Sequence, residues 1–193
     1  MSTPTAVQLQ PGRVYRTRDL APWTRNPPRL AKALVAKGLL TPLAHGLFVH
    51  PRASRFGPVP PTDSELMTAY LCGSPFVVTG SARWNSLGLG STGVDVTTLV
   101  YNTKRSGEFK LGGRRYRLRR TAFPENPPPE WFVIDLLEHA DEAGADSATL
   151  VTHLGRALED GVFNPAVLTA MAARYGSKLT QRRLKPLLAA DAK

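Results

Sequence analysis

Apolar and polar positions are most regularly patterned between residues 16 and 51. After Asn26, apolar side chains recur every three or four positions as far as Gly38, which predicts an amphipathic helix. Asn26 suits the N-cap, Pro27 suits the first helical position, and Gly38 suits the first position past the helix end. The residues that share the apolar face are Leu30, Ala31, Leu34 and Val35.

The opposite face of this predicted helix is basic and otherwise small. Its members are Arg29, Lys32, Ala33, Ala36 and Lys37. Small side chains let a helix settle into the major groove of DNA, where cations contact phosphates and guanine edges. The face therefore indicates a recognition helix. A solvated face on an ordinary amphipathic helix is the alternative interpretation.

A helix and a hairpin flank this segment. Thr17 can cap a helix that runs through Trp23 before the turn. After the basic helix the period becomes strand-like, because residues 39–40 and 47–49 are apolar and can pair across a loop at residues 42–46. Helix, turn, helix and hairpin in this order predict a winged helix-turn-helix.

The start of the chain is short for such a domain. Only residues 5–10 can form the helix that usually comes first, because Pro4 and Pro11 bracket them. Either this first helix is truncated or another segment covers that side of the core. Residues 14–15 can form a short strand that pairs with the hairpin.

Residues 62–123 predict a mixed sheet with short helices. The predicted elements are a helix at 64–71 capped by Thr62 or Asp63, a strand at 76–79, a helix at 82–87, a buried strand at 94–101, and a hairpin of 109–111 and 115–119 on a Gly112-Gly113 turn. In the last strand, Tyr116 and Leu118 alternate with Arg115, Arg117 and Arg119. This row of guanidinium groups can contact phosphates, or it can be solvated or paired with the acidic helices that follow.

The remainder of the chain predicts helices behind a proline-rich break at residues 124–130. The predicted helices are 130–143, which is mostly buried, 146–160 with Asp146 as cap, 164–175 opened by Asn164 and Pro165, and 180–190 with Thr180 as cap. Their pattern is amphipathic, so they are expected to pack on one another as a helical part.

Composition divides the chain at a Pro- and Gly-rich linker over residues 52–61. The sequence therefore predicts an α+β protein with two domains. The first, at residues 1–57, is a winged helix-turn-helix DNA-binding domain. The second, at residues 62–193, has a sheet part at 62–123 and a helical part at 124–193.

The distribution of charged residues along the chain supports this division into two domains. The net charge is +10, which favours a polyanionic partner. Residues 1–57 hold nine Lys and Arg against one acidic residue, whereas residues 124–173 hold one against nine. A uniformly basic surface is thereby excluded, and the N-terminal domain becomes the first place to look for nucleic-acid binding.

Three features predict a cytoplasmic protein. Cys72 is the only cysteine, so neither a disulfide within the chain nor a cysteine zinc site can form. No apolar run is long enough for a membrane helix. Residues 1–13 lack the basic-then-apolar order of a signal peptide.

Residues 66–105 and the hairpin before them resemble a known family. The motifs are Gly73-Ser74-Pro75, Val78-Thr79-Gly80-Ser81-Ala82, Asn85-Ser86-Leu87-Gly88-Leu89 and the strand at 96–100, preceded by Gly38-Leu39-Leu40 and Gly46-Leu47-Phe48-Val49. They resemble the AbiEi-type antitoxins, the regulatory half of type IV, or abortive-infection, toxin–antitoxin pairs. The similarity is clearest over residues 14–120. Arg83-Trp84 and the short first helix depart from the family pattern.

The resemblance implies a function and partners. Members of this family repress transcription of their own operon by binding repeats in its promoter. They neutralise a nucleotidyltransferase-like toxin without forming a stable complex with it. The implied partners are therefore double-stranded promoter DNA and, functionally, the cognate toxin, with no membrane.

Two sets of residues are candidates for these contacts. The predicted DNA-binding residues are Arg18, Thr24, Arg25, Asn26, Arg29, Lys32, Ala33, Lys37, His45, Arg52 and Arg55. A second basic surface, for DNA, RNA or protein, comprises Lys104, Arg105, Arg114, Arg115, Arg117, Arg119, Arg182 and Arg183.

Catalytic chemistry finds little support in the sequence, and no catalytic residue, metal site or cofactor is predicted. The four histidines are scattered without a zinc-binding motif, and no phosphate-binding loop or nucleophile elbow is present. Two alternatives to a repressor remain. One is an RNA- or toxin-binding module without sequence-specific DNA binding. The other is a Mg²⁺-dependent nuclease built on the acidic cluster Asp135, Glu138, Asp141 and Glu142.

Overall fold

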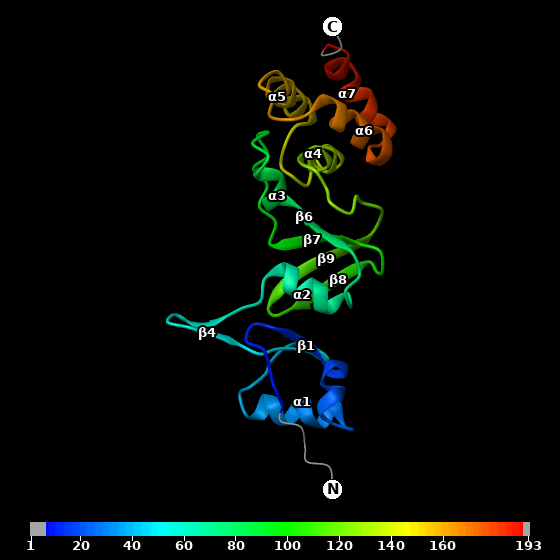
Figure 1. Cartoon of the computed structure of the whole chain (residues 1–193). Coiled ribbons are helices and arrows are strands. Elements are labelled where there is room, and N and C mark those ends of the chain that lie inside the picture. Colours follow the sequence, from blue (N-terminus) through cyan, green and yellow to red (C-terminus); the bar gives the residue numbers. More distant parts are fainter. Residues whose placement is uncertain (1–6, 191–193) are drawn as a thin grey trace. The chain divides into compact units, whose positions relative to one another are not determined.

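The computed structural model describes residues 7–190 and confirms a mixed α+β protein with several small sheets (Figure 1). The chain divides into two compact units. The first unit comprises Met1–Pro75 and Glu108–Tyr116, and the second comprises Phe76–Gly107 and Arg117–Lys193. The predicted boundary between residues 57 and 62 thus falls inside the first unit.

The first unit begins with a three-stranded antiparallel sheet of order β1-β3-β2. Its elements are β1 (Val14–Arg16), the 3-10 helix η1 (Thr17–Trp23), α1 (Pro27–Ala36), β2 (Thr41–Ala44) and β3 (Leu47–Val49). The strand predicted at residues 14–15 pairs with the hairpin, with Val14 opposite Val49. The helix predicted at residues 5–10 is not present at residues 7–10, and residues 5 and 6 lie outside the described part.

Helix α1 has the ends that its sequence predicts. The Asn26 side chain accepts a hydrogen bond from the N–H of Arg29 at 3.2 Å. At the other end, Gly38 takes a φ of +71°, which a glycine adopts without steric cost. The N–H of Leu39 then donates to the carbonyl of Leu34, closing the helix. Ala31 and Leu34 are buried in a core with Tyr15, Leu20 and Leu40.

The hairpin after α1 differs from its predicted boundaries. Residues 39–40 do not form a strand, because they complete the helix end and Leu40 packs in the core. Residues 42–44 of the predicted loop instead belong to β2, which starts at Thr41, and the turn is only His45-Gly46. Pro42 is tolerated there because β2 lies at the edge of the sheet, where a missing N–H costs no pairing.

The predicted linker at residues 52–61 is largely a hairpin. Strands β4 (Arg52–Ser54) and β5 (Gly57–Val59) pair antiparallel, with Arg52 opposite Val59. Composition misled the prediction, because the same glycine and prolines that break a helix fit a tight turn and an isolated two-stranded ribbon. The first unit then continues through α2 (Asp63–Tyr70), whose cap is Thr62 in a reciprocal arrangement with Glu65.

The second unit contains β6 (Phe76–Thr79), α3 (Ser81–Asn85) and β7 (Thr97–Asn102). Strands β6 and β7 pair antiparallel. The predicted buried strand at residues 94–101 starts three residues late, and Val94 and Val96 are 90% and 86% exposed. The Asp95 side chain accepts the N–H of Thr97, so this segment makes a local turn instead of a ladder.

A four-stranded sheet has the order β6-β7-β9-β8. Strands β8 (Gly107–Leu111) and β9 (Arg114–Arg120) form the predicted hairpin on Gly112-Gly113. Tyr116 and Leu118 are buried, as their alternation predicts. The division between the two units passes through β9, after Tyr116.

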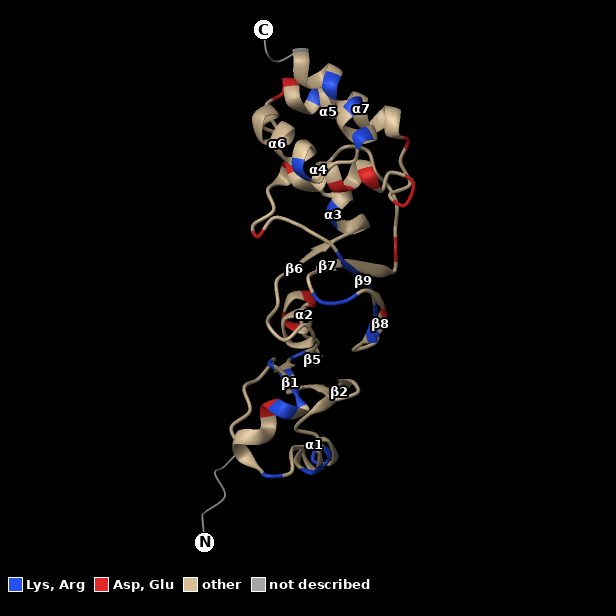
Figure 2. Cartoon of the chain, turned by 90° about the vertical axis from the view of Figure 1, so that its right-hand side faces the viewer, with Lys and Arg blue, Asp and Glu red and all other residues tan. Residues whose placement is uncertain are grey.

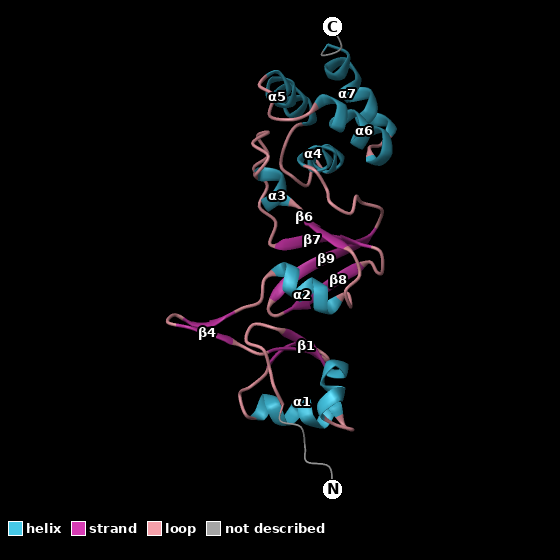
Figure 3. Ribbon diagram, in the orientation of Figure 1, coloured by secondary structure: helices cyan, strands magenta, loops and turns pink. Residues whose placement is uncertain are grey.

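Four helices complete the second unit (Figure 3). They are α4 (Pro129–Glu138), α5 (Ser147–Glu159), α6 (Pro165–Tyr175) and α7 (Lys178–Ala190). Helix α4 is mostly buried as predicted, but it ends at Glu138 instead of residue 143. Thr180 is not the cap of α7, because Ser177 accepts its N–H and Thr180 lies inside the helix. Among the described helices, none is long and apolar enough to cross a membrane.

Candidate functional site

Helix α1 carries more Lys and Arg than the other described helices of the first unit (Figure 2). Arg29, Lys32 and Lys37 are exposed, with the small Ala33 between them. Within residues 7–190, no acidic side chain forms an ion pair with any of these three cations. Their charges are therefore available to an external anion.

A groove connects this face with the turn between β2 and β3. It has a volume of about 640 Å³ and is mainly apolar. Lys32 of α1 and His45 of the turn both line it, with Phe48 and Val35 among its apolar residues. The fold thus brings two predicted contact residues, 13 positions apart in the sequence, to one groove.

The residues before α1 form its N-terminal turn. Arg25 and Asn26 are exposed, and Thr24 is half-buried. The Thr24 hydroxyl accepts the N–H of Asn26 at 3.1 Å, which fixes the chain as it enters α1. Arg18 is exposed on η1. Asn26 and Thr24 therefore have structural roles that account for their presence, whereas Arg18 and Arg25 have exposed side chains.

Arg52 and Arg55 lie on the hairpin β4–β5. The guanidinium of Arg52 is 3.8 Å from the carboxylate of Glu65, and both side chains are largely exposed. Such a pair contributes little to stability. Arg55 lies in the turn, where its guanidinium carbon is 4.6 Å from the ring centroid of Phe56.

The predicted second basic surface includes arginines with internal partners. In the first unit, Arg114 donates to the carboxylate of Asp63 at 2.7 Å and to the carbonyl of Pro61. In the second unit, Arg117 and Arg119 each lie 3.2 Å from Glu142. Arg115 is exposed. The sequence left open whether the arginine row pairs with a later acidic segment. Two of the three arginines in the row, Arg117 and Arg119, make such a pair through Glu142.

The other members of that set are distributed over two elements. Lys104 and Arg105 follow β7, where the Asn102 side chain accepts both of their N–H groups at 2.8 Å. On α7, Arg183 donates to the hydroxyl of Ser147 at 3.1 Å, and Arg182 is exposed. The set therefore comprises separate local groups with different contacts.

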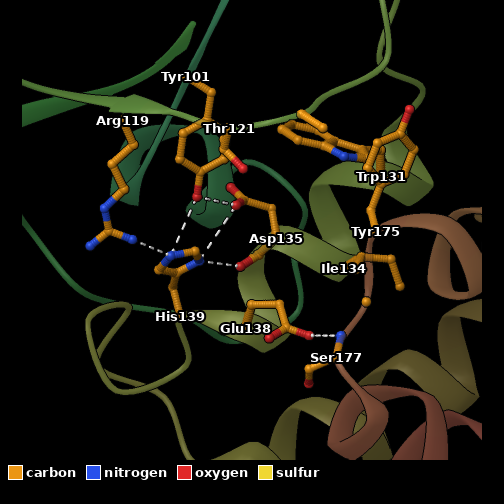
Figure 4. A pocket seen from close by; sticks show the side chains of 12 residues that line it. Tyr101, Arg119, Thr121, Trp131, Ile134, Asp135, Glu138, His139, Tyr175 and Ser177 are labelled. Atoms are coloured by element: carbon orange, nitrogen blue, oxygen red, sulfur yellow. Dashed lines mark hydrogen bonds and ion pairs between the residues drawn. The ribbon is translucent and has the colours of Figure 1, made fainter. Parts of the chain in front are cut away.

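A buried polar cluster around Asp135 is the main feature of the second unit that sequence reasoning missed (Figure 4). Asp135 is 5% exposed, and its carboxylate accepts hydrogen bonds from the hydroxyls of Thr79 and Tyr101 and from the indole N–H of Trp84. Three donors satisfy a carboxylate that would otherwise be costly to bury. Burial, followed by the charge of Asp135, raises the pKa of the Tyr101 hydroxyl far above its usual value.

His139 extends this cluster toward Arg119. Its Nδ1 lies 2.8 Å from the backbone oxygen of Asp135, and its Nε2 lies 2.7 Å from Nη1 of Arg119. A guanidinium only donates, so in this geometry Nε2 is the acceptor toward Arg119 and Nδ1 is the ring nitrogen that donates to the backbone oxygen of Asp135. The ring also stacks on Trp84, with an interplanar angle of 16°.

These side chains border a cavity of about 460 Å³. Trp131, Tyr175 and Ser177 contribute to its walls, together with Glu138. Burial acts to raise the pKa of Glu138, but hydrogen bonds from Thr180 and Ser177 outweigh it and hold the pKa below its usual value. The N–H of Ser177 donates to Glu138 at 2.7 Å, so this carboxylate ties α4 to the start of α7.

Three of the four acidic residues suggested for Mg²⁺ are occupied by other contacts, and the fourth, Asp141, is exposed. Asp135 accepts three hydrogen bonds, Glu138 accepts from Ser177, and Glu142 pairs with two arginines. In the described residues, no group of three or more His, Cys, Asp or Glu is arranged to hold a metal ion. The helical spacing that suggested a shared site is lost after Glu138, where α4 ends.

One signal in the sequence pointed to the buried cluster. Asp135 and His139 are four positions apart in a mostly apolar run, which places two polar side chains on one side of a buried helix. A buried carboxylate requires donors, but local spacing does not reveal that they come from Thr79, Trp84 and Tyr101.

Comparison with known proteins bears on the fold of the chain. No protein-family model matches the sequence, and no curated protein matches it. Among solved structures, the chain is similar to the crystal structure of the RV2827C protein from Mycobacterium tuberculosis, with a TM-score of 0.58 and 15% sequence identity. The match covers 94% of this chain and 73% of that chain. At this identity the similarity concerns the fold alone.

Proposed function

We propose that the protein is a sequence-specific DNA-binding repressor whose first unit contains a winged helix-turn-helix. In this proposal α1 is the recognition helix and β2–β3 is the wing. The observation that supports it best is the outer face of α1, where Arg29, Lys32 and Lys37 surround small side chains and lack acidic partners within the described residues. Phosphate contacts would supply affinity, and α1 would supply sequence choice.

The biological role in this proposal is that of an antitoxin of the AbiEi type, which represses the operon of a type IV toxin–antitoxin pair. This part rests on the motifs at residues 66–105 and on the wing-like segment. It adds a nucleotidyltransferase-like toxin as functional partner. Repression would follow from steric occlusion of the promoter.

Fluorescence anisotropy tests the DNA-binding part directly. The purified protein is titrated against DNA from upstream of its own gene and against a shuffled duplex, at about 50 mM and about 150 mM salt. Specific repression predicts a preference of about a thousandfold or more at the higher salt. Equal, steeply salt-dependent binding to both duplexes would contradict the proposal.

Variants of α1 test the placement of the recognition helix. Arg29→Ala and Lys32→Ala should each weaken binding to the upstream DNA by about tenfold. Lys110→Ala is the matched control, because it removes an exposed cation from β8 in the same unit. Unchanged affinity in both α1 variants would remove α1 from the interface.

A further inference from the structure

The tip of hairpin β4–β5 exposes a large aromatic side chain that the proposed function does not use. Phe56 is 86% exposed at the turn. Contact of a phenylalanine ring with water is unfavourable, so a partner that covers the ring at the end of this projecting element would gain binding free energy. Figure 1 shows this hairpin extending away from the helix and sheet of its own unit.

The hairpin presents Phe56 in a fixed geometry. Arg52, Ala53 and Ser54 pair in register with Val59, Pro58 and Gly57. The Ser54 hydroxyl donates to the carbonyl of Gly57 at 2.7 Å and accepts the N–H of Phe56 at 3.2 Å. These two bonds close the turn, and Pro58 restricts the returning strand. A preorganised tip loses little entropy when it binds.

Charge identifies the kind of partner. Residues 51–61 contain Arg52 and Arg55 and no acidic residue. The guanidinium of Arg55 lies over the ring of Phe56, so a cation and an apolar wedge occupy the same tip. Proteins that bind the minor groove combine these two groups: the cation is attracted by the negative potential of the groove, and the wedge enters between base pairs.

We propose that Arg55 and Phe56 form a minor-groove wedge. Arg55 enters the groove, and the ring of Phe56 inserts at a base step and partly unstacks it. The inference rests on the proposed function, because α1 must hold duplex DNA against the same unit. Pyrimidine–purine steps unstack most readily, so the wedge prefers a TA or CA/TG step at its position. Specificity then arises at a step that α1 does not read.

Permanganate footprinting tests the wedge on the upstream DNA as a whole, so the operator need not be mapped first. Permanganate oxidises unstacked thymines, and every TA or CA/TG step contains a thymine. On the upstream DNA, the wild-type protein should give a DNase I footprint and at least one hyperreactive thymine within or beside it. Phe56→Ala should keep the footprint, lose the hyperreactive thymine and raise the Kd about tenfold.

Matched variants separate the wedge from other causes. Phe56→Leu retains an apolar wedge and should retain the hyperreactive thymine. Val59→Ala, on β5 of the same hairpin, should change the Kd by less than about twofold. Arg55→Ala should lower the slope of log Kd against log salt by about one.

The outcomes distinguish the two proposals. A footprint without a hyperreactive thymine, or one whose reactivity survives Phe56→Ala, overturns the wedge and leaves the DNA-binding proposal standing. Absence of any footprint overturns both, because the wedge requires bound duplex. Circular dichroism of Phe56→Ala should match the wild type, since the side chain is exposed in the free protein.

Discussion

Arg29 and Lys32 on α1 face solvent without an acidic partner in the described chain, whereas Arg117 and Arg119 on β9 both pair with Glu142 at 3.2 Å. Both segments are basic in sequence. Their surroundings differ, because residues 1–57 contain a single acidic residue, Asp19, and it is bound by Arg16 at 2.9 Å. The segment after α4 instead supplies Glu142.

This difference separates charges available for binding from charges used within the fold. A cation without a partner keeps its full attraction for phosphate and releases counterions when it binds. A paired guanidinium must first give up its carboxylate. We therefore expect substitutions on α1 to change DNA affinity and leave stability intact, and substitutions in the β9 and α4 region to do the reverse.

The largest expected effect is on stability, at Asp135. Asp135→Asn replaces a carboxylate oxygen by an amide NH₂ that faces donors, since Thr79 and Trp84 donate to Oδ2 and Tyr101 donates to Oδ1. We expect a loss of about 3 kcal/mol in the free energy of unfolding, measured by urea denaturation. The exposed Asp141→Asn should change it by less than about 0.5 kcal/mol. Equal effects of the two variants would show that the cluster does not stabilise the fold.

The next largest effect is on DNA binding by α1. The double variant Arg29→Ala with Lys32→Ala should lose about 2 to 3 kcal/mol of binding free energy for the upstream DNA, measured by anisotropy at about 150 mM salt. Its urea midpoint should match the wild type, because both side chains are exposed. Loss of stability in this variant would contradict the separation of the two regions.

Local patterns predicted several elements of the fold correctly. Asn26-Pro27 and Asn164-Pro165 predicted the starts of α1 and α6, and both asparagines accept backbone N–H groups there. Gly38 predicted the end of α1. Such features depend on a few neighbouring residues, so the sequence alone carries the information.

Features that depend on distant partners were not predictable in the same way. Residues 52–61 have the composition of a linker. No local sequence feature distinguishes a linker of this composition from a hairpin whose proline lies on an unpaired edge. Arg117 and Arg119 of β9 form ion pairs with Glu142, and the buried carboxylate of Asp135 accepts hydrogen bonds from donors on three separate elements. These pairings join positions 23 or more residues apart, so only the folded chain reveals them.

A smaller effect is expected for the ion pair of Arg117. A double-mutant cycle of Arg117→Ala and Glu142→Ala should give a coupling energy of about 0.5 kcal/mol, because both side chains are partly exposed. Arg117→Ala should change the affinity for upstream DNA by less than about twofold. A tenfold loss of affinity would instead assign β9 to the interface and would remove the contrast with α1.

The smallest expected effect depends on pH, at Glu138. Hydrogen bonds from Ser177 and Thr180 hold its pKa below the usual value of about 4.5, so the ionised form is favoured in the folded state. The stabilisation is therefore complete above the unfolded pKa and is lost as pH falls through the lower folded pKa. Because this carboxylate is partly exposed, we expect it to contribute less than about 0.5 kcal/mol to the free energy of unfolding. Urea denaturation between about pH 7 and pH 3 should show a shallower decline for Glu138→Gln than for the wild type. Parallel curves would mean that Glu138 does not couple α4 to the start of α7 through its charge.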